Sequence, residues 1–139
     1  MQDFSQLKPI KQFNQGKHSS KVILLEENIV AKHHSPKETE FFEIERKILE
    51  QLKGCPFVPQ LLYADKKERI LYMTYCGEPV PLWDKQVKDQ VKVLVKELKH
   101  KWGVKRAFFS SKLPKRHNVC LKDGRIFLID FNSGQWLLK

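Results

Sequence analysis

The sequence has no long apolar run and little cysteine. No stretch approaches the roughly 18 consecutive apolar residues that a membrane-spanning helix needs. The first six residues lack the basic region and apolar core of a secretory signal. Its three cysteines, Cys55, Cys76 and Cys120, are widely spaced and form no Cys-x-x-Cys pair, which argues against a disulfide framework or a zinc knuckle. We therefore expect a soluble, cytoplasmic protein that makes no membrane contact.

Acidic residues are also scarce. Sixteen Asp and Glu stand against 26 Lys and Arg, a formal net charge of +10. The imbalance is sharpest in segment 96–117, where eight Lys or Arg accompany one acid, Glu97. Such a segment favours a partner that carries phosphate: a nucleotide, a nucleic acid or a phosphorylated protein. The alternative is a solvated surface that only aids solubility.

The 139 residues suffice for one domain with a single core. Apolar patterning and turn residues predict strands at 11–13, 21–26 and 28–33, with a tight turn at Glu27-Asn28. A capping box at Ser35 begins a helix that runs to about Lys53. A second helix is expected over 84–102, and we expect its apolar stripe to be core rather than a cofactor site.

One carboxylate falls in the middle of the first helix's apolar stripe. At about 100° per residue, Glu45 points to the centre of that stripe, where an unpaired charge is costly. Lys32, in the apolar strand just before the helix, is the candidate partner. We expect an inward Lys32–Glu45 ion pair. The alternative places Glu45 at the stripe's edge and Lys32 on an exposed strand face.

The residue pattern around Asp123 and Gly124 predicts a hairpin. Asp123-Gly124 is a strong two-residue turn signal between two apolar runs. Counting back from that turn places Asn118 and Asp130 almost opposite each other at the open end. An amide and a carboxylate at this place suit a divalent cation, although many such hairpins are purely structural.

Four segments together resemble the protein kinase family, in the family's order. They are Val30-Ala31-Lys32, the run from Glu45 to Leu52, the run from Ile70 to Glu78, and Asn118 with Asp130-Phe131-Asn132 in place of Asp-Phe-Gly. The resemblance implies an α+β, protein-kinase-like fold: an antiparallel five-stranded sheet with one helix, a hinge and a much reduced second lobe. Residues 1–76 would form the first part and 77–139 the second.

The resemblance also implies a site for ATP and Mg²⁺. Lys32 and Glu45 would hold the phosphates, Asn118 and Asp130 the metal, and Lys115 would lie on the γ-phosphate side. The hinge would meet adenine, with Met73 as gatekeeper, followed by Thr74, Tyr75 and Cys76. Gly16, Lys17 and Ser19 would contact phosphate, although their segment has one glycine where the family usually has three and suits an ordinary hairpin loop equally well.

Two departures from the family weaken the expectation of catalysis. Leu113 stands where the family has its base aspartate, and the sequence ends nine residues after Asp130, without the segment that docks peptide substrates. Our first hypothesis is a pseudokinase-like regulator that binds a nucleotide or a protein partner. The alternatives are a divergent serine/threonine kinase-type phosphotransferase and a basic scaffold that binds nucleic acid or an acidic partner. Oligomeric state is left open, and the histidines, His33 and His34 among them, are interpreted as surface or supporting residues.

Overall fold

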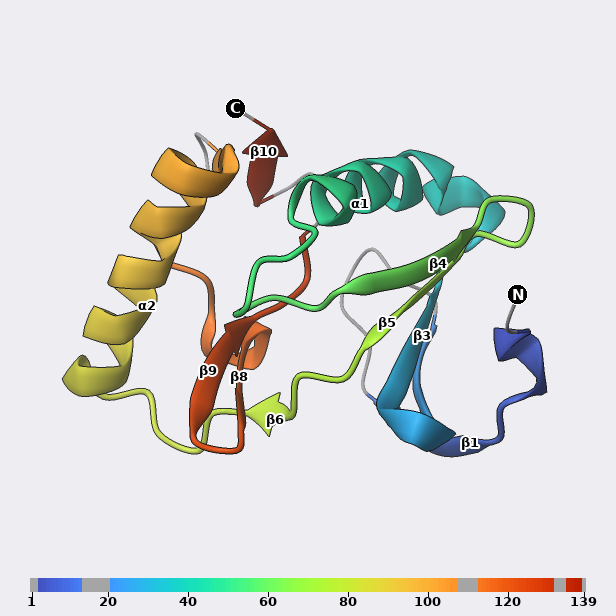
Figure 1. Cartoon of the computed structure of the whole chain (residues 1–139), viewed down its shortest axis with the longest axis horizontal. Helices are drawn as coiled ribbons and strands as arrows, with labels where there is room; N and C mark the ends of the chain where they lie inside the picture. Colours follow the sequence, from blue (N-terminus) through green and yellow to red (C-terminus); the bar gives the residue numbers. More distant parts are fainter. Residues whose placement is uncertain (1–2, 14–20, 108–112, 132–134, 139) are drawn as a thin grey trace.

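One half of the molecule is a five-stranded antiparallel sheet (Figure 1). The computed structural model describes residues 3–13, 21–107, 113–131 and 135–138. The strands are β1 (Pro9–Phe13), β2 (Lys21–Leu25), β3 (Ile29–His33), β4 (Leu61–Asp65) and β5 (Ile70–Thr74), in the spatial order β1-β2-β3-β5-β4. A 3-10 turn, η1 (Phe4–Gln6), precedes the sheet. The three strands expected from the sequence are confirmed, with ends shifted by one or two residues.

The turn between β2 and β3 has the predicted tight form. Glu27 and Asn28 both adopt positive φ, at 65° and 57°, inside the short η2 turn (Glu26–Asn28). Asparagine tolerates this left-handed conformation better than most residues. The turn sets the β2–β3 register and therefore decides which side of β3 faces the core.

Helix α1 (Thr39–Gln51) packs on the sheet and begins as predicted. A 3-10 turn, η3 (Pro36–Glu38), leads into it, and Glu38 Oε1 accepts hydrogen bonds from the Ser35 backbone N–H and hydroxyl at 3.2 and 3.0 Å. The helix ends at Gln51 rather than Lys53, because Leu52 leaves helical geometry. Four of its residues are buried: Phe42, Glu45, Ile48 and Leu49.

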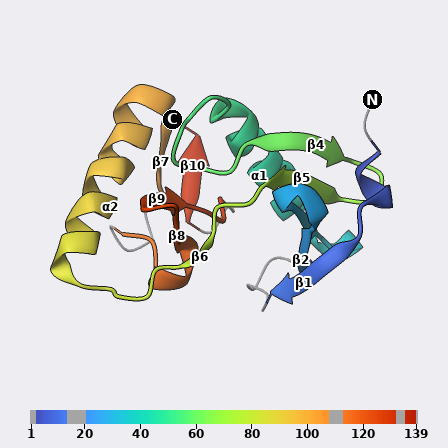
Figure 2. The same ribbon diagram turned by 60° about the horizontal axis from the view of Figure 1, so that its bottom comes forward.

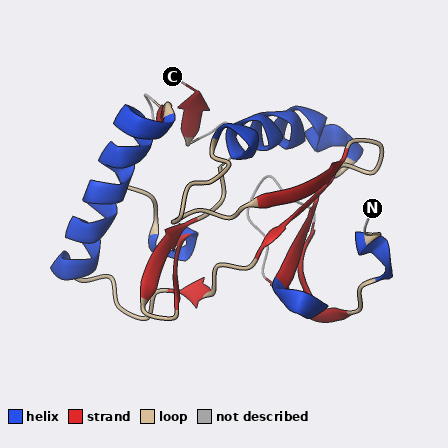
Figure 3. Cartoon of the chain, in the orientation of Figure 1, coloured by secondary structure: helices blue, strands red, loops and turns tan. Residues whose placement is uncertain are grey.

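The other half contains one long helix and two small sheets (Figures 1 and 3). Helix α2 (Lys85–Glu97) continues into a π-helical turn, η4 (Leu98–Trp102), so the predicted second helix is confirmed with a change of winding near its end. The sheets are β6 (Glu78–Pro79), β8 (Val119–Lys122) and β9 (Arg125–Leu128) in the order β6-β8-β9, and β7 (Val104–Arg106) paired with β10 (Trp136–Leu138). Figure 2 shows β7 and β10 lying between α2 and α1.

The predicted hairpin is β8 and β9. Asp123 and Gly124 occupy its turn with φ of 53° and 76°, as a type I′ connection requires. The Leu128 N–H donates to the Phe57 carbonyl at 2.9 Å, which joins the hairpin to the segment that follows α1.

A single large hydrophobic cluster runs through both halves. Fully buried members come from α1, β5, α2, β9 and the chain after it: Phe42, Leu71, Val91, Leu128, Phe131 and Trp136. The apolar stripe of α2 therefore lies in the core, as expected. Within the described ranges, no helix is long and apolar enough to cross a membrane.

Candidate functional site

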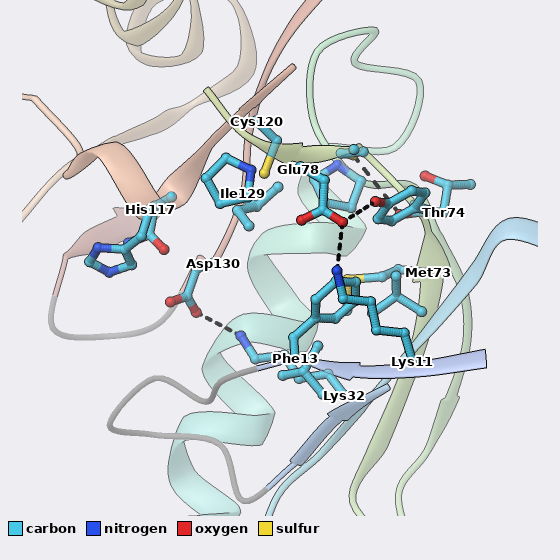
Figure 4. A pocket seen from close by; sticks show the side chains of 18 of the residues that line it. Lys11, Phe13, Lys32, Met73, Thr74, Glu78, His117, Cys120, Ile129 and Asp130 are labelled. Carbon is cyan, nitrogen blue, oxygen red and sulfur yellow. Dashed lines mark hydrogen bonds and ion pairs between the residues drawn. The ribbon is translucent and has the colours of Figure 1, made fainter. Parts of the chain in front are cut away.

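A pocket of about 590 Å³ lies between the five-stranded sheet and the β8–β9 hairpin (Figure 4). Most of the site residues predicted from the sequence line it. They are Lys32, Glu45, Met73, Thr74, Tyr75, Cys76, Asn118 and Asp130. These residues come from β3, α1, β5 with the following hinge, and the two sides of the hairpin's open end. The fold therefore brings segments almost 100 positions apart in the sequence to one cavity.

Lys32 is held between two carboxylates. Its Nζ lies 2.8 Å from Glu45 Oε1 and donates to Oε2 at 3.0 Å, so the predicted inward ion pair is confirmed. The same Nζ donates to Asp130 Oδ1 at 2.6 Å. Glu45 Oε2 also accepts a hydrogen bond from the Phe131 backbone N–H at 3.2 Å. The helix carboxylate thus binds both the lysine and the residue that follows Asp130.

These buried charges compensate one another. Lys32 is 8% exposed and Glu45 is 1% exposed, so each would carry a large desolvation penalty if it stood alone. Burial by itself lowers the pKa of Lys32, but the charges of Asp130 and Glu45 outweigh that effect and raise the Lys32 pKa above its ordinary value. Lys32 therefore stays protonated at neutral pH and presents a fixed positive charge in the pocket.

His34 supports the same group and is not a surface residue. It is buried, its Nε2 lies 3.7 Å from Glu45 Oε1, and its ring meets the edge of Phe42. His34 directly follows β3, two residues after Lys32, so strand alternation continued by one residue would have placed it on the same face as Lys32.

Asp130 has a strained backbone. Its φ is +69°, in the left-handed region that costs a non-glycine residue of the order of 1–2 kcal/mol. Strain of this kind is often found at functional sites, where the surrounding structure maintains it. Here the conformation accompanies a carboxylate that reaches Lys32 while Phe131, the next residue, is fully buried.

Asn118 is hydrogen-bonded to Ile129, the residue between the end of β9 and Asp130. It closes the 3-10 turn η5 (Arg116–Asn118), and its carbonyl accepts the Ile129 N–H at 3.0 Å, which confirms the predicted meeting at the hairpin's open end. Its amide Nδ2 donates to Gln135 Oε1 at 3.4 Å, which leaves the amide oxygen for a cation. Gln135 was not predicted, because nothing in its local sequence marks it.

The donor set fits Mg²⁺ bound together with phosphate. Mg²⁺ prefers oxygen ligands and usually takes one or two protein carboxylates, with phosphate and water completing its shell. Asp130 and Asn118 supply a carboxylate and an amide oxygen. No group of three or more His, Cys, Asp or Glu able to hold a metal ion occurs among the described residues.

One backbone N–H group of the hinge is the candidate donor to adenine. The N–H groups of Thr74 and Tyr75 donate to the carbonyls of Gln60 and Asn28 at 3.0 and 3.1 Å. Of the three predicted hinge residues, Cys76 is therefore the one whose N–H is the candidate donor to a base. Gly77 follows with φ of +93°, and a Cβ there would collide with the carbonyl of Leu121, so the hinge passes directly against β8.

The hinge side of the pocket carries a cluster that the sequence did not reveal. Glu78 Oε1 accepts hydrogen bonds from Lys11 Nζ and the Tyr75 hydroxyl, both at 3.1 Å. Phe13 stacks on Tyr75 with ring centroids 6.2 Å apart. Figure 4 shows Lys11, Phe13 and Glu78 on the opposite side of the pocket from His117. The cluster joins β1 to the hinge next to the expected adenine position.

The structure leaves four of the predicted phosphate contacts open. Lys115 is exposed at the residue before η5 and is not among the pocket's lining residues, so its expected contact with the γ-phosphate stays a prediction. Its backbone is extended there, and its side chain is left in solvent. Gly16, Lys17 and Ser19 lie in segment 14–20, outside the described residues.

Leu113, at the position expected for the catalytic base, has an apolar environment. Leu113 is half-buried and packs against the large hydrophobic cluster. The neighbouring pocket residue His117 is exposed and was interpreted only as a surface or supporting residue. The loop therefore presents no carboxylate at this point.

The comparisons with known proteins support the fold. No family model and no curated protein matches the chain. Among solved structures, it is similar to the ternary complex of streptomycin, ATP and the aminoglycoside phosphotransferase APH(2")-IIa, with a TM-score of 0.53 and 12% identity. The match covers 91% of this chain but only 66% of that one. At this identity the likeness concerns the fold alone: a mixed α/β arrangement with a five-stranded antiparallel sheet and two helices, consistent with a kinase-like N-lobe. The reduced second lobe stays a prediction.

Proposed function

We propose that this chain is a kinase-like domain that binds an adenine nucleotide with Mg²⁺ and acts as a regulator rather than as an efficient kinase. The observation that carries the proposal is the position of Lys32 between Glu45 and Asp130 in a pocket large enough for a nucleotide. A buried, permanently charged lysine beside a carboxylate suits a ligand that brings both phosphate and a cation. The ATP-bound neighbour of the same fold supports this choice.

Each part of the pocket has a role in such a complex. The apolar side chains of Val22, Val30 and Ile129 would enclose the base, and the Cys76 N–H would donate to it. Lys32 would contact phosphate oxygens while Glu45 keeps the ammonium group in place. When bound, Mg²⁺ would neutralise phosphate charge.

Asp130 would change partners in that complex. Its Oδ1 now accepts a hydrogen bond from Lys32. In the complex, the Asp130 carboxylate and the Asn118 amide oxygen would hold the metal. The exchange keeps the local charge balanced, because the ligand's phosphates replace Asp130 as the anionic partner of Lys32.

The absence of a base carboxylate is the reason for proposing a regulator. A positioned general base contributes about 10²–10⁴-fold in typical enzymes, and Leu113 cannot accept or orient a hydroxyl proton. Phosphoryl transfer depends mostly on positioning and electrostatics, so a slow phosphotransferase is the second candidate. A regulator would act through a protein partner, and we place it in the cytoplasm, where its three buried free thiols would stay reduced.

Calorimetry with ATP, with and without Mg²⁺, tests the proposal. We expect weak binding that Mg²⁺ strengthens. The Asp130→Asn variant should lose the Mg²⁺ effect, whereas the matched variant Asp123→Asn, in the exposed hairpin turn, should retain it. No heat and no thermal shift at millimolar ATP would reject nucleotide binding and favour the basic scaffold. Release of phosphate that depends on Asp130 would instead favour the phosphotransferase.

A further inference from the structure

Helix α2 and the turn after it carry a continuous row of lysines outside the pocket. The row consists of Lys85, Lys88, Lys92, Lys96 and Lys99, which we call the lysine stripe. Successive members are three or four residues apart, so they fall within a sector of about 80° on the helix surface. Over 14 residues the row extends about 21 Å along the helix. None of these lysines lines the nucleotide pocket.

The stripe lies beside the buried face of α2. Val91 and Leu98 are fully buried and anchor the helix to the core. Of the stripe, Lys88 is half-buried, with its Nζ 5.9 Å from the centre of the Trp83 ring, and Lys85 and Lys99 are exposed. Lys92 and Lys96 are exposed. Figure 1 shows α2 along the left edge of the molecule, on the far side of the β8–β9 hairpin from the five-stranded sheet.

One carboxylate, Asp89, lies beside the lysine stripe and pairs with two of its members. Asp89 Oδ2 pairs with Lys85 at 2.7 Å, and its Oδ1 lies 3.8 Å from Lys92. Ion pairs between exposed side chains are weak and are screened by salt, so both lysines can exchange Asp89 for another anion. The four lysines of α2 in the stripe accompany one carboxylate, Asp89, so the row keeps a net positive charge.

We propose that the lysine stripe is a docking surface for the phosphate backbone of duplex DNA, read without regard to sequence. Neighbouring lysines of such a row are about 5–6 Å apart, and a duplex offers a negative charge for every ~1.7 Å of its axis. A row of cations about 21 Å long therefore lies in the field of several phosphates at once. Release of condensed counterions supplies the affinity.

The composition of the stripe favours backbone contact over base contact. Helix α2 contains no arginine for a bidentate contact with guanine and no aromatic side chain on which an unpaired base could stack. The nearby Trp83 and Trp102 are half-buried and pack against the core. A duplex, whose bases are already stacked, suits this surface better than a single strand.

A membrane surface is a poorer match. Helices that lie in a lipid interface insert a broad apolar face beside their basic residues. In α2 the apolar face is buried in the core, and Val93 is its one large exposed hydrophobic side chain. Attraction to lipid headgroups would therefore lack the apolar contribution that normally accompanies it.

The test measures binding of the full chain to a labelled, mixed-sequence DNA duplex at several salt concentrations. We expect the triple variant Lys88→Glu, Lys92→Glu, Lys96→Glu to make the slope of log affinity against log salt shallower by about 3. The matched control Lys53→Glu, Lys66→Glu, Lys67→Glu changes net charge equally at exposed sites on the other half of the molecule. This control variant should retain most of the affinity for DNA.

Three outcomes with the unmodified chain and the triple variants would overturn the proposal. They are no binding by the unmodified chain, equal loss in the two triple variants, and binding to anionic lipid vesicles but not to DNA. Thermal melting of both triple variants shows whether they are folded, and a Lys92→Gln, Lys96→Gln variant gives a milder change. If that milder variant, folded, binds as tightly as the unmodified chain, the stripe is not the contact.

Discussion

Asp130 follows Lys32 by 98 positions in the chain, yet its Oδ1 lies 2.6 Å from the lysine Nζ, closer than either oxygen of Glu45. One lysine thus joins β3, α1 and the end of the hairpin. This three-way contact links the stability of the fold to the proposed nucleotide site.

Removing the Lys32 charge should destabilise the protein. Lys32→Met would leave Glu45 buried without a cation, a situation that typically costs roughly 3–5 kcal/mol. The double variant Lys32→Met, Glu45→Gln removes both charges and should recover part of the loss. Chemical denaturation measures each free energy of unfolding. A single variant as stable as the unmodified protein would mean that the pair is solvated in solution.

Gln135 should influence metal binding through Asn118. Without the Gln135 oxygen, the Asn118 amide can rotate, and its oxygen is no longer held for the cation. Partners of metal ligands typically affect affinity by about 10–100-fold, and for this single long hydrogen bond we expect the lower end. Calorimetry of Mg²⁺-dependent ATP binding compares Gln135→Ala with Gln86→Ala, an exposed glutamine of α2. Equal behaviour of the two variants would remove Gln135 from the site.

Gly77 should not tolerate a side chain. Its positive φ and its approach to the Leu121 carbonyl leave no room for a Cβ, so Gly77→Ala must displace the hinge or the hairpin. We expect a loss of at least about 1–2 kcal/mol, together with weaker nucleotide binding. Gly124→Ala is the control: φ is also positive there, but no heavy atom lies close to the added methyl. If both cost the same, only the backbone conformation matters.

Stability should fall at alkaline pH. Burial raises the pKa of Cys76 and of Cys120 to about 12, from an ordinary value of 9.0. Above pH 9 the unfolded chain loses thiol protons that the folded chain keeps, so the free energy of unfolding decreases as pH rises toward 12. The raised pKa of Lys32 acts in the same direction, since its stabilisation is complete below its ordinary value of 10.5 and is lost above it.

Denaturation at a series of pH values measures this slope. The Cys76→Ala, Cys120→Ala variant should show a shallower decline than the unmodified chain above pH 9, the ordinary thiol value. An unchanged slope would show that these thiols ionise as easily in the folded protein as in the unfolded chain.

Transfer to peptides should be negligible. The loop offers Leu113 where a carboxylate would orient the acceptor, which removes about 10²–10⁴-fold from the rate. A radiolabel assay on generic peptides, with Asp130→Ala as the control, tests this. Robust labelling that disappears in the control would mean that another group performs the task of the base.

The local sequence predicted those features of the protein that depend on residues close together in the chain. The alternation of β3 and the periodicity of α1 place Lys32 and Glu45 on facing surfaces, and the cost of an unpaired buried charge then requires that they meet. Asp123-Gly124 likewise determines the hairpin turn, and with it the positions of Asn118 and Asp130.

Tertiary structure decided the contacts between segments that are remote in the chain. Asp130 as a second partner of Lys32, Gln135 beside Asn118, and Glu78 bridging Lys11 and Tyr75 all depend on how the hairpin docks against the sheet. No periodicity encodes that docking, because it follows from the packing of one shared core in three dimensions. The exposure of Lys115 was likewise decided by tertiary structure: its spacing from Asn118 resembles the family, and its side chain lies in solvent before η5.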